Sequence, residues 1–429
     1  MPPTAATVGE KPPIDQPRTG SRLIFIDVLR VALIVLVIAH HAGQAYGPTG
    51  GDWPVTEPES MDWLGSFFAV NAAFFMGLLF LLAGYFVPRS YDRRGSSSFL
   101  SGRWKRLGIP LVVLCLGVHL PVAYLIDEES SGLGEFLRNS YDNGWQEIYI
   151  HLWFLGHLLL YSALYVLGRS LLDRRKRNLG VKWPVPGNGA IVAFIVVLAV
   201  VSWLVRSSYP IDEWVPLFFV LATEPAHLPQ YVGMFAIGVI AYRGDWLRRI
   251  SVSTGMIWLV IGVAASTALY WVRAFSPETW RDVVDTGEGL SLDSLMYPAW
   301  EAVICAGLSV GLIVLFRERF NRAGKILVAM AAASYTAYIL HLMIVVFTQM
   351  GLEGTDVPIL AKFLIVTAVG VALAFWLGHL ARRVPGLRVI LGIQPGPKKP
   401  AVNESEEAEP APLETAGTGL ESSGNDGAQ

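Results

Sequence analysis

Charge is scarce in this chain. Asp, Glu, Lys and Arg make up 16% of its 429 residues, against roughly 25% in an average soluble domain. Neither sign dominates, because 33 Lys and Arg face 35 Asp and Glu and leave a net charge of -2. A nucleic-acid-binding surface needs an excess of basic residues, so we expect no nucleic-acid partner. A disordered protein is excluded as well, since 53% of the residues are hydrophobic.

Cysteine is nearly absent too. Cys115 and Cys305 both lie within apolar runs, so they can build neither a disulfide framework nor a zinc site. The adjacent histidines, His40 and His41, lack the i, i+4 spacing of a helical metal motif, and the chain contains no HExxH sequence. We therefore expect no metal site. Glycine-rich phosphate loops are missing as well.

Long apolar runs, by contrast, recur along the chain. A helix needs about 20 mostly apolar residues to span a membrane, and we predict ten such helices in an all-α integral membrane protein. They cover residues 23–45, 64–87, 107–126, 150–169, 189–206, 229–243, 254–273, 299–316, 327–348 and 359–380. Gly77 and Gly84 in the second span fit close packing against another helix. The apolar stretch from Trp214 to Ala222 is too short to cross and is predicted to be interfacial or re-entrant.

The basic residues lie mostly on one side of these spans. Most of the 33 occupy the segments on the side of the N-terminus, whereas the opposite loops hold only Arg138 and Arg281. The positive-inside rule therefore places both termini in the cytoplasm, in a multi-pass protein of the inner or plasma membrane. Residues 1–20 and 396–429 are polar and lack apolar periodicity, so we expect two disordered cytoplasmic tails around one transmembrane domain at 21–385.

The first predicted span is the richest in ionisable residues. An ionisable side chain inside a span is costly unless it is paired, which makes each one a candidate for function. Arg30 and His41 are eleven residues apart, so on a helix they share one face to within ~20° and are separated by ~16 Å along the axis. Asp27 lies one turn below Arg30, at a spacing that suits an ion pair. The alternative is an anchor pair at the interface, with histidines that mark the outer membrane boundary.

Two arginines, Arg103 and Arg106, precede the third span. Three residues apart at the start of a helix, they can face the same anion and would suit a phosphate group. Basic residues on the cytoplasmic flank of a span are also explained by topology. Taken alone, the spacing favours the topological explanation.

Polar side chains also enter the later spans. Ser334, Tyr338 and His341 are spaced by four and three residues, so they form one polar stripe that we expect to line a cavity. Glu301 lies at the outer edge of its span and is a candidate for an acceptor site. Trp153 offers a stacking surface for a sugar, or else belongs to the aromatic belt at the interface.

Five motifs, in their order along the chain, resemble those of the membrane-bound acyltransferase-3 family. They are Asp27-x-Leu29-Arg30 with His41, Leu82-Ala83-Gly84-Tyr85-Phe86, Phe99…Arg103-x-x-Arg106-Leu107…Pro110, His151-Leu152-Trp153-Phe154-Leu155, and Ser334-Tyr335-x-x-Tyr338-x-x-His341. The set covers nearly all of the chain between the tails and looks most like the branch that contains the succinyltransferase of osmoregulated periplasmic glucans. Ala83 stands where the family usually has Ser, so no hydroxyl can be assumed there.

The resemblance implies an enzyme that takes an acyl group from a cytoplasmic acyl-CoA, such as acetyl-CoA or succinyl-CoA, and places it on a hydroxyl of a sugar or glycan at the outer face. By similarity, Arg30 and His41 are the essential pair of the first span, and Arg103 and Arg106 bind the donor. His41 would then be the general base. Arg30, held by Asp27, would orient the donor or stabilise developing negative charge.

Two other classes of protein stay open at this point. A proton-coupled transporter or lipid-intermediate flippase could use Asp27, Glu301 and the histidines as a proton relay, although transporters usually show repeated halves and no repeat is visible here. A membrane sensor or scaffold would not need Arg30 and His41 on one face. The sequence does not indicate the acyl group, the acceptor or the oligomeric state.

Overall fold

Helices dominate the computed structural model, which describes residues 23–48, 53–127, 130–174, 183–275 and 290–393. The tails predicted at 1–20 and 396–429 lie outside these residues. The helices of the first half are α1 (Ile24–Gly43), α2 (Trp63–Arg94), α3 (Ser96–Arg103), α4 (Ile109–Leu114), α5 (Leu120–Ile126), α6 (Leu133–Asp142), α7 (Gln146–Tyr149) and α8 (Trp153–Arg174). Those of the second half are α9 (Asn188–Arg206), α10 (Leu228–Gly244), α11 (Trp246–Arg249), α12 (Val252–Phe275), α14 (Met296–Arg319), α15 (Lys325–Leu352), α16 (Ile359–Ala381) and α17 (Pro385–Ile390).

Nine helical segments within the described residues are long and apolar enough to cross a membrane, and each overlaps a predicted span. They are Ile24–Tyr46, Trp63–Arg94, Ser96–Leu125, Trp153–Leu172, Asn188–Arg206, Val252–Phe275, Asp293–Arg319, Lys325–Leu352 and Ile359–Ala381. The remaining predicted span, 229–243, is helical as α10, whose 17 residues are at the short end of the length that can cross a membrane. The chain is therefore a multi-pass helical membrane protein.

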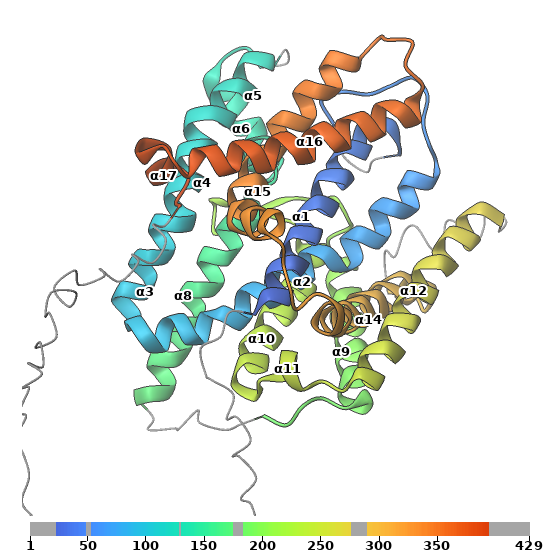
Figure 1. The fold of residues 1–429 in the computed structure, drawn as a ribbon. Helices are drawn as coiled ribbons and strands as arrows, with labels where there is room; N and C mark the ends of the chain where they lie inside the picture. The colour runs from blue at the N-terminus through green and yellow to red at the C-terminus, as the bar shows by residue number, and fades with distance from the viewer. Residues whose placement is uncertain (1–22, 49–52, 128–129, 175–182, 276–289, 394–429) are drawn as a thin grey trace, which may run out of the picture. The chain divides into compact units, whose positions relative to one another are not determined.

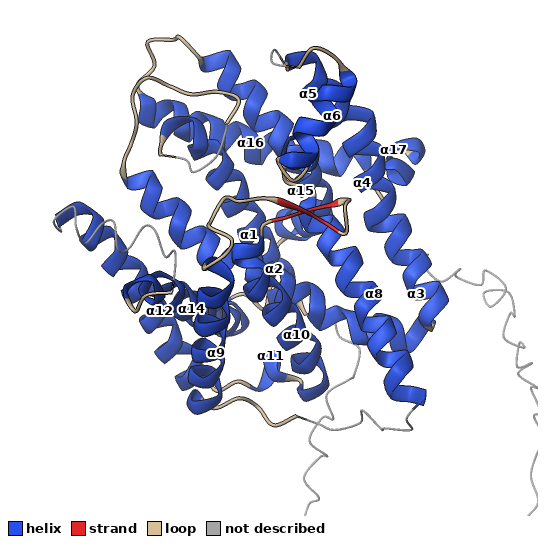
Figure 2. Ribbon diagram, turned by 180° about the vertical axis from the view of Figure 1, so that it is seen from behind, coloured by secondary structure: helices blue, strands red, loops and turns tan. Residues whose placement is uncertain are grey.

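Helices α1 and α2 lie in the middle of the bundle. Figures 1 and 2 show α3, α4 and α8 on one side of them and α9, α12 and α14 on the other. Helix α10 packs closely on α2 because two glycines let the backbones approach. A Cβ at Gly84 would be 2.3 Å from the carbonyl oxygen of Phe235, and one at Gly238 would be 2.1 Å from that of Leu81. The predicted packing role of Gly84 is thus confirmed.

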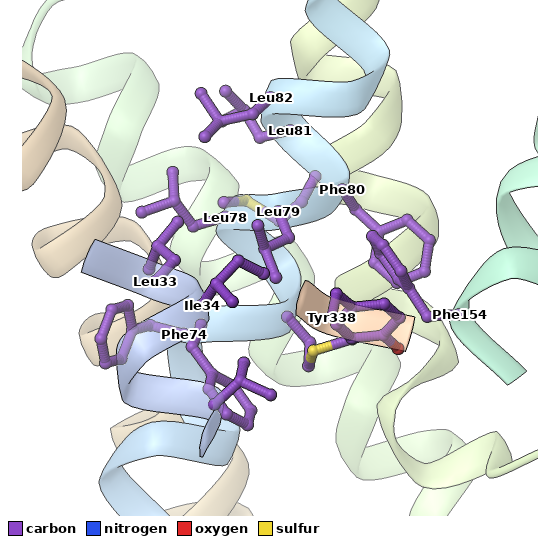
Figure 3. Packing of buried hydrophobic residues seen from close by; sticks show 14 of the residues in the cluster. Leu33, Ile34, Phe74, Leu78, Leu79, Phe80, Leu81, Leu82, Phe154 and Tyr338 are labelled. Carbon is purple, nitrogen blue, oxygen red and sulfur yellow. The ribbon is translucent and has the colours of Figure 1, made fainter. Parts of the chain in front are cut away.

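The buried core follows the apolar side chains of α1 and α2. Figure 3 shows Leu33 and Ile34 of α1 facing the leucine run of α2, with Phe80, Phe154 and Tyr338 gathered at one side. The ring of Phe154 lies 4.7 Å from that of Phe80 and 5.6 Å from that of Tyr338, between centroids. This aromatic contact joins α2, α8 and α15.

A short β-hairpin interrupts the helical fold where the sequence predicted an interfacial or re-entrant stretch. Strands β1 (Val215–Leu217) and β2 (Leu221–Thr223) pair antiparallel, and Figure 2 shows them in red. The hairpin packs on the start of α8, and its turn is held by Trp145 and Tyr149, whose side chains donate to the carbonyls of Phe219, at 3.1 Å, and Val220, at 2.6 Å. The sequence did not predict these strands, but one two-stranded hairpin leaves the all-α class of the membrane protein unchanged.

Candidate functional site

His41 lies in the last turn of α1 and is held by two neighbours. Its Nδ1 is 2.8 Å from Oε1 of Gln44, and its ring stacks on the indole of Trp53, with 5.6 Å between centroids and 11° between planes. Because an amide oxygen can only accept a hydrogen bond, Nδ1 carries the proton of the neutral ring. Nε2 is therefore the nitrogen that presents a lone pair.

Gln349 on α15 fastens this end of α1. Its Nε2 donates to the backbone carbonyls of His41, at 3.3 Å, and of Ala42, at 3.1 Å. Its Oε1 accepts from the indole N–H of Trp53 at 2.9 Å. The last carbonyls of a helix lack α-helical partners. The amide of Gln349 bonds two of them here, and the carbonyl of His41 also accepts from the backbone N–H of Gln44. Trp53, the end of α1 and α15 are thus joined around His41.

Two further histidines extend from His41: His341 contacts His41, and His151 contacts His341. The ring of His341 lies 5.2 Å from that of His41 and 4.9 Å from that of His151, between centroids. Tyr338 ties His151 to His341, since its hydroxyl donates to the carbonyl of His151 and its own carbonyl accepts from Nδ1 of His341. We call His41, His151 and His341 the histidine cluster. Within the described residues, no group of three His, Cys, Asp or Glu is arranged to hold a metal ion.

The backbone just before His151 is strained. Ile150 has φ 48° and ψ -110°, a conformation that is a clear outlier for a β-branched residue. The turn directs the ring of His151 toward α15, where its Nε2 lies 3.0 Å from the carbonyl oxygen of Ile339. Strained residues persist where the surroundings over-determine them, and they concentrate at functional sites. The position of His151 is therefore built into the fold at an energetic cost.

Ser334 shares the predicted stripe but does not reach the histidine cluster. Its hydroxyl donates to the carbonyl of Met330 in the same helix, at 3.0 Å. The next residue, Tyr335, makes the contact between segments: its hydroxyl donates to the carbonyl of Arg106, and its ring lies 5.1 Å from the guanidinium of Arg106. Helix α15 therefore contacts Arg106 through Tyr335 and His41 through His341.

Arg103 and Arg106 stand at a π-helical turn, η2 (Trp104–Gly108). The guanidinium of Arg103 lies 5.1 Å from the ring centre of Phe99, while Arg106 is exposed. Pro110 follows four residues after Arg106 and has no N–H to bond the carbonyl of Arg106. That carbonyl accepts from Tyr335 instead. Turns of the π-helical kind are rare in proteins, but those that occur are often located at functional sites.

Arg30 and Asp27 form the predicted ion pair in the first turns of α1. The Arg30 side chain is 35% exposed and that of Asp27 is 17% exposed, so the pair is only partly buried. Eleven residues of helix separate Arg30 from His41, which corresponds to ~16 Å. Arg30 is therefore remote from the histidine cluster.

Glu301 belongs to a second buried group. Its carboxylate pairs with Arg206 of α9 and, at 3.0 Å, with Nε2 of His227, whose Nδ1 lies 2.8 Å from a carboxylate oxygen of Glu224. We call Arg206, Glu224, His227 and Glu301 the ion-pair cluster. Burial disfavours the charged imidazole, but the two carboxylates outweigh it and raise the pKa of His227 to about 10. Two cations thus face two anions, and both oxygens of Glu301 are engaged.

Trp153 lies between the two clusters and belongs to neither. Its ring stacks on Tyr231 at 5.1 Å, and Tyr231 stacks in turn on His227 at 6.0 Å, between centroids. Phe154, the next residue, contacts Tyr338. Along these contacts, the rings of Tyr231 and His227 connect Trp153 to Glu301. The path from Trp153 to His41 is longer by one ring, since it passes through Phe154, Tyr338 and His341.

Sequence reasoning missed four residues around these clusters: Gln44, Trp53, Gln349 and Arg206. Gln349 follows Tyr338 by eleven residues, so the polar stripe of α15 could have been extended to it. Arg206 carried a signal as well, because an arginine at the outer end of a span runs against the positive-inside rule. Gln44 and Trp53 follow no periodic pattern.

Comparisons with known proteins cover most of the described chain. A family model for an acyltransferase domain, acyltransferase-3, matches residues 23–379. The chain is similar to the glucans biosynthesis protein C of Escherichia coli K12, with 29% identity over 154 residues, which are 35% of this chain and 40% of that protein. The same protein from Escherichia coli SMS-3-5 matches to the same extent. The chain thus covers less than half the length of these curated relatives, and no solved structure matches it.

Proposed function

The chain belongs to the acyltransferase-3 family, and from this premise we propose that it transfers an acyl group from acyl-CoA to a hydroxyl of a sugar or glycan. The donor, acetyl-CoA or succinyl-CoA, enters from the cytoplasm, and the acceptor is modified at the outer face of the inner membrane. Because the name of these relatives refers to the biosynthesis of glucans, a glucan is the first acceptor to test. No metal takes part in this scheme, in which the protein's own side chains act on the two substrates.

His41 is the general base of the proposed reaction. Its Nδ1–H is fixed on Gln44, so Nε2 is free to take the proton of an acceptor hydroxyl, and an imidazole has a suitable pKa range for that task. The hydroxyl oxygen then attacks the thioester carbonyl carbon, the C–S bond breaks, and CoA leaves as its thiolate. A side chain that is held in one orientation before the substrate binds loses less entropy in the reaction.

The observation that carries the proposal is the pair of contacts made by α15. Tyr335 touches Arg106 at one level of the helix, and His341 touches His41 six residues later. Six residues of α-helix rise about 9 Å. A basic site and a base thus lie one above the other, as required for a long donor whose phosphates stay at one end while its acyl group reaches the other.

The donor's phosphates bind at Arg103 and Arg106, because a guanidinium matches phosphate oxygens with two parallel N–H groups. Arg30 is ~16 Å below His41 along α1, so it contacts the arm or the phosphates of the donor and does not stabilise the reacting carbonyl. Asp27 holds Arg30 in position. The acceptor approaches His41 from the side of Trp53, with Trp153, Tyr338 and Glu301 further along.

The roles of Trp153 and Glu301 toward the acceptor differ. Trp153 is only partly buried, and its ring can carry the apolar face of a sugar. Both oxygens of Glu301 are already paired, so this residue supports the acceptor side by holding Arg206 and His227 in place. The hydroxyl of Ser334 is bonded within α15, to the carbonyl of Met330.

The base assignment is tested with purified protein in lipid nanodiscs, radiolabelled acetyl- or succinyl-CoA and a panel of glycan acceptors. The wild type should release CoA and label an acceptor, and His41→Ala should lower the rate by at least about 100-fold. His379→Ala, which alters a histidine remote from both clusters, should keep the wild-type rate. Equal rates for His41→Ala and the wild type would remove His41 from the reaction, and absence of CoA release by the wild type would favour a transporter.

The donor site is tested by binding of acyl-CoA to two variants. Arg103→Ala combined with Arg106→Ala should weaken binding by at least about tenfold, since a hydrogen bond to a charged group contributes roughly 1.5–3 kcal/mol. Lys105→Ala removes a charge from the same turn but from neither arginine, and it should bind nearly as the wild type does. If the double variant and Lys105→Ala bind alike, the arginines serve only the topology.

A further inference from the structure

The three rings of the histidine cluster are all fastened through one nitrogen. Nδ1 of His41 is bonded to Gln44, Nε2 of His151 to the carbonyl of Ile339, and Nδ1 of His341 to the carbonyl of Tyr338. Each partner is an oxygen that accepts, so the fastened nitrogen carries the proton in the neutral ring. The other nitrogen of each ring is left with a lone pair.

Two of these lone pairs, on Nδ1 of His151 and on Nε2 of His341, have no hydrogen-bond partner among the described residues. Of the two residues, His341 is the one whose ring contacts that of His41. The His341 side chain is 0% exposed. A buried acceptor without a donor costs roughly 1–3 kcal/mol, so a feature of this kind in the middle of a bundle calls for an explanation. A proton that arrives during a reaction would satisfy it.

The position of His341 indicates that such a proton would come from His41 and move toward the donor. Its ring lies 5.2 Å from that of His41, between centroids, a separation at which one edge of each ring can approach hydrogen-bond distance. Along α15, His341 stands between Gln349, which bonds the carbonyl of His41, and Tyr335, which contacts Arg106. It is thus on the donor side of the base. The ionisable groups in ring contact with it are His41, His151 and Tyr338.

We propose that His341 is the proton partner of His41, which carries the acceptor's proton to the leaving thiolate. This inference rests on the proposed acyl transfer. The hydroxyl proton moves to Nε2 of His41 as the new C–O bond forms. The C–S bond breaks and its electron pair stays on sulfur. The proton passes from His41 to Nε2 of His341 and then to sulfur, so the products are the ester and the thiol of CoA. Both rings return to the neutral state.

His341→Asn tests the role without removing the structural bond. The amide N–H of Asn can occupy the place of Nδ1 and donate to the carbonyl of Tyr338, but nothing replaces Nε2. We expect kcat to fall by about 100-fold or more, with the KM values for acyl-CoA and for the acceptor nearly unchanged. In His341→Gly, added imidazole should restore a large part of kcat, because it supplies the missing nitrogen in the vacated space.

His157→Asn is the matched control. His157 is as deeply buried, but both of its nitrogens have partners, the carbonyl of Trp153 at 3.0 Å and the hydroxyl of Thr223 at 3.2 Å. The kcat of the His157→Asn variant should be close to the wild-type value and should not change when imidazole is added. The inference is overturned if His341→Asn keeps the wild-type kcat, or if imidazole fails to rescue a folded His341→Gly. Either result leaves the proposed function intact as long as the wild type releases CoA and His41→Ala does not.

Discussion

The carboxylate of Glu301 lies between two cationic side chains in a buried site. Arg206 pairs with one oxygen and His227 with the other, and His227 pairs in addition with Glu224. Bringing such charges out of water is expensive, and removing one partner from a buried pair typically costs about 3–5 kcal/mol, since the other charge is left uncompensated. The ion-pair cluster therefore fixes α9, α14 and the start of α10 relative to one another.

The stability that His227 contributes should depend on pH. Folding raises its pKa from the ordinary 6.5 to about 10, because Glu224 and Glu301 favour the charged ring by more than burial disfavours it. The folded state thus binds the proton more tightly than the unfolded state, so the contribution is complete below pH 6.5 and is lost as the pH rises to about 10. We expect His227→Gln to melt well below the wild type at pH 6, with the two melting temperatures converging toward pH 10.

The melting temperatures are measured in detergent by intrinsic fluorescence. His379→Gln serves as the control, because His379 forms no ion pair with a carboxylate in the described part of the chain, and its difference from the wild type should not shrink as the pH rises. A difference for His227→Gln that stays constant from pH 6 to pH 10 would contradict the ion-pair account of this residue.

At the scale of residues, the contacts that could be predicted from the sequence are those between side chains of the same helix. Asp27 and Arg30 are one turn apart, and their pairing is confirmed. Tyr338 and His341 share a face, and they do share a site. That His341 meets His41, or that Arg206 meets Glu301, depends on how helices far apart in the chain are set against each other. A single sequence holds no direct signal for that.

At the scale of elements, the donor-side turn shows how one missing hydrogen bond shapes a contact. Pro110 interrupts the helical bonding of the third span at Arg106, and the free carbonyl is taken by Tyr335 of α15. Gly392, just after α17, also packs there. Its φ is +61°, which suits glycine, and a Cβ at this position would lie 2.4 Å from the carbonyl oxygen of Arg106. Three segments thus set the position of Arg106.

Gly392→Ala should disturb the donor site without touching an arginine. The added methyl group meets the backbone of Arg106, and the positive φ is unfavourable for alanine, so the η2 turn must shift. We expect binding of acyl-CoA to weaken by up to about tenfold, the loss of most of one charge-assisted hydrogen bond. Titration calorimetry on the nanodisc protein measures it.

Gly386→Ala provides the comparison for this experiment. Gly386 lies in α17 itself, and a Cβ there would meet nothing within 4 Å. Alanine also favours a helix over glycine by up to about 1 kcal/mol. This variant should bind acyl-CoA as the wild type does. Equal binding by Gly392→Ala would show that the contact of α17 with the η2 turn has no part in donor binding.

Helix positions were predictable because mean hydropathy is a local property. Nine predicted spans coincide with long apolar helices of the described chain, although the third begins earlier, at Ser96, since α3 continues through two π-helical turns into α5. The stretch from Trp214 to Ala222 was recognisable as too short to cross. Its strands were not, because their pairing is set by the residues on which the hairpin rests, among them Trp145 and Tyr149.

At the scale of the whole molecule, the proposed reaction requires one orientation of the protein in the membrane. The fold alone does not determine which side faces the cytoplasm. Arg106 and Tyr335 must face the cytoplasm if the donor is a cytoplasmic acyl-CoA, and Trp53 and the ion-pair cluster must then face outward. Which side is which was predicted only from the distribution of basic residues. The two native cysteines are buried, so single cysteines introduced at exposed positions can report the orientation with little background.

Labelling of intact cells with a membrane-impermeant maleimide should therefore divide four variants into two pairs. Ser131→Cys and Thr355→Cys lie at exposed sites on the predicted outer side and should react in intact cells. Ser251→Cys and Asn321→Cys are equally exposed on the predicted cytoplasmic side and should react only after lysis. The wild type gives the background. The reverse pattern would put Arg103 and Arg106 outside, away from the cytoplasmic pool of acyl-CoA, and the basic turn could then no longer serve as its binding site.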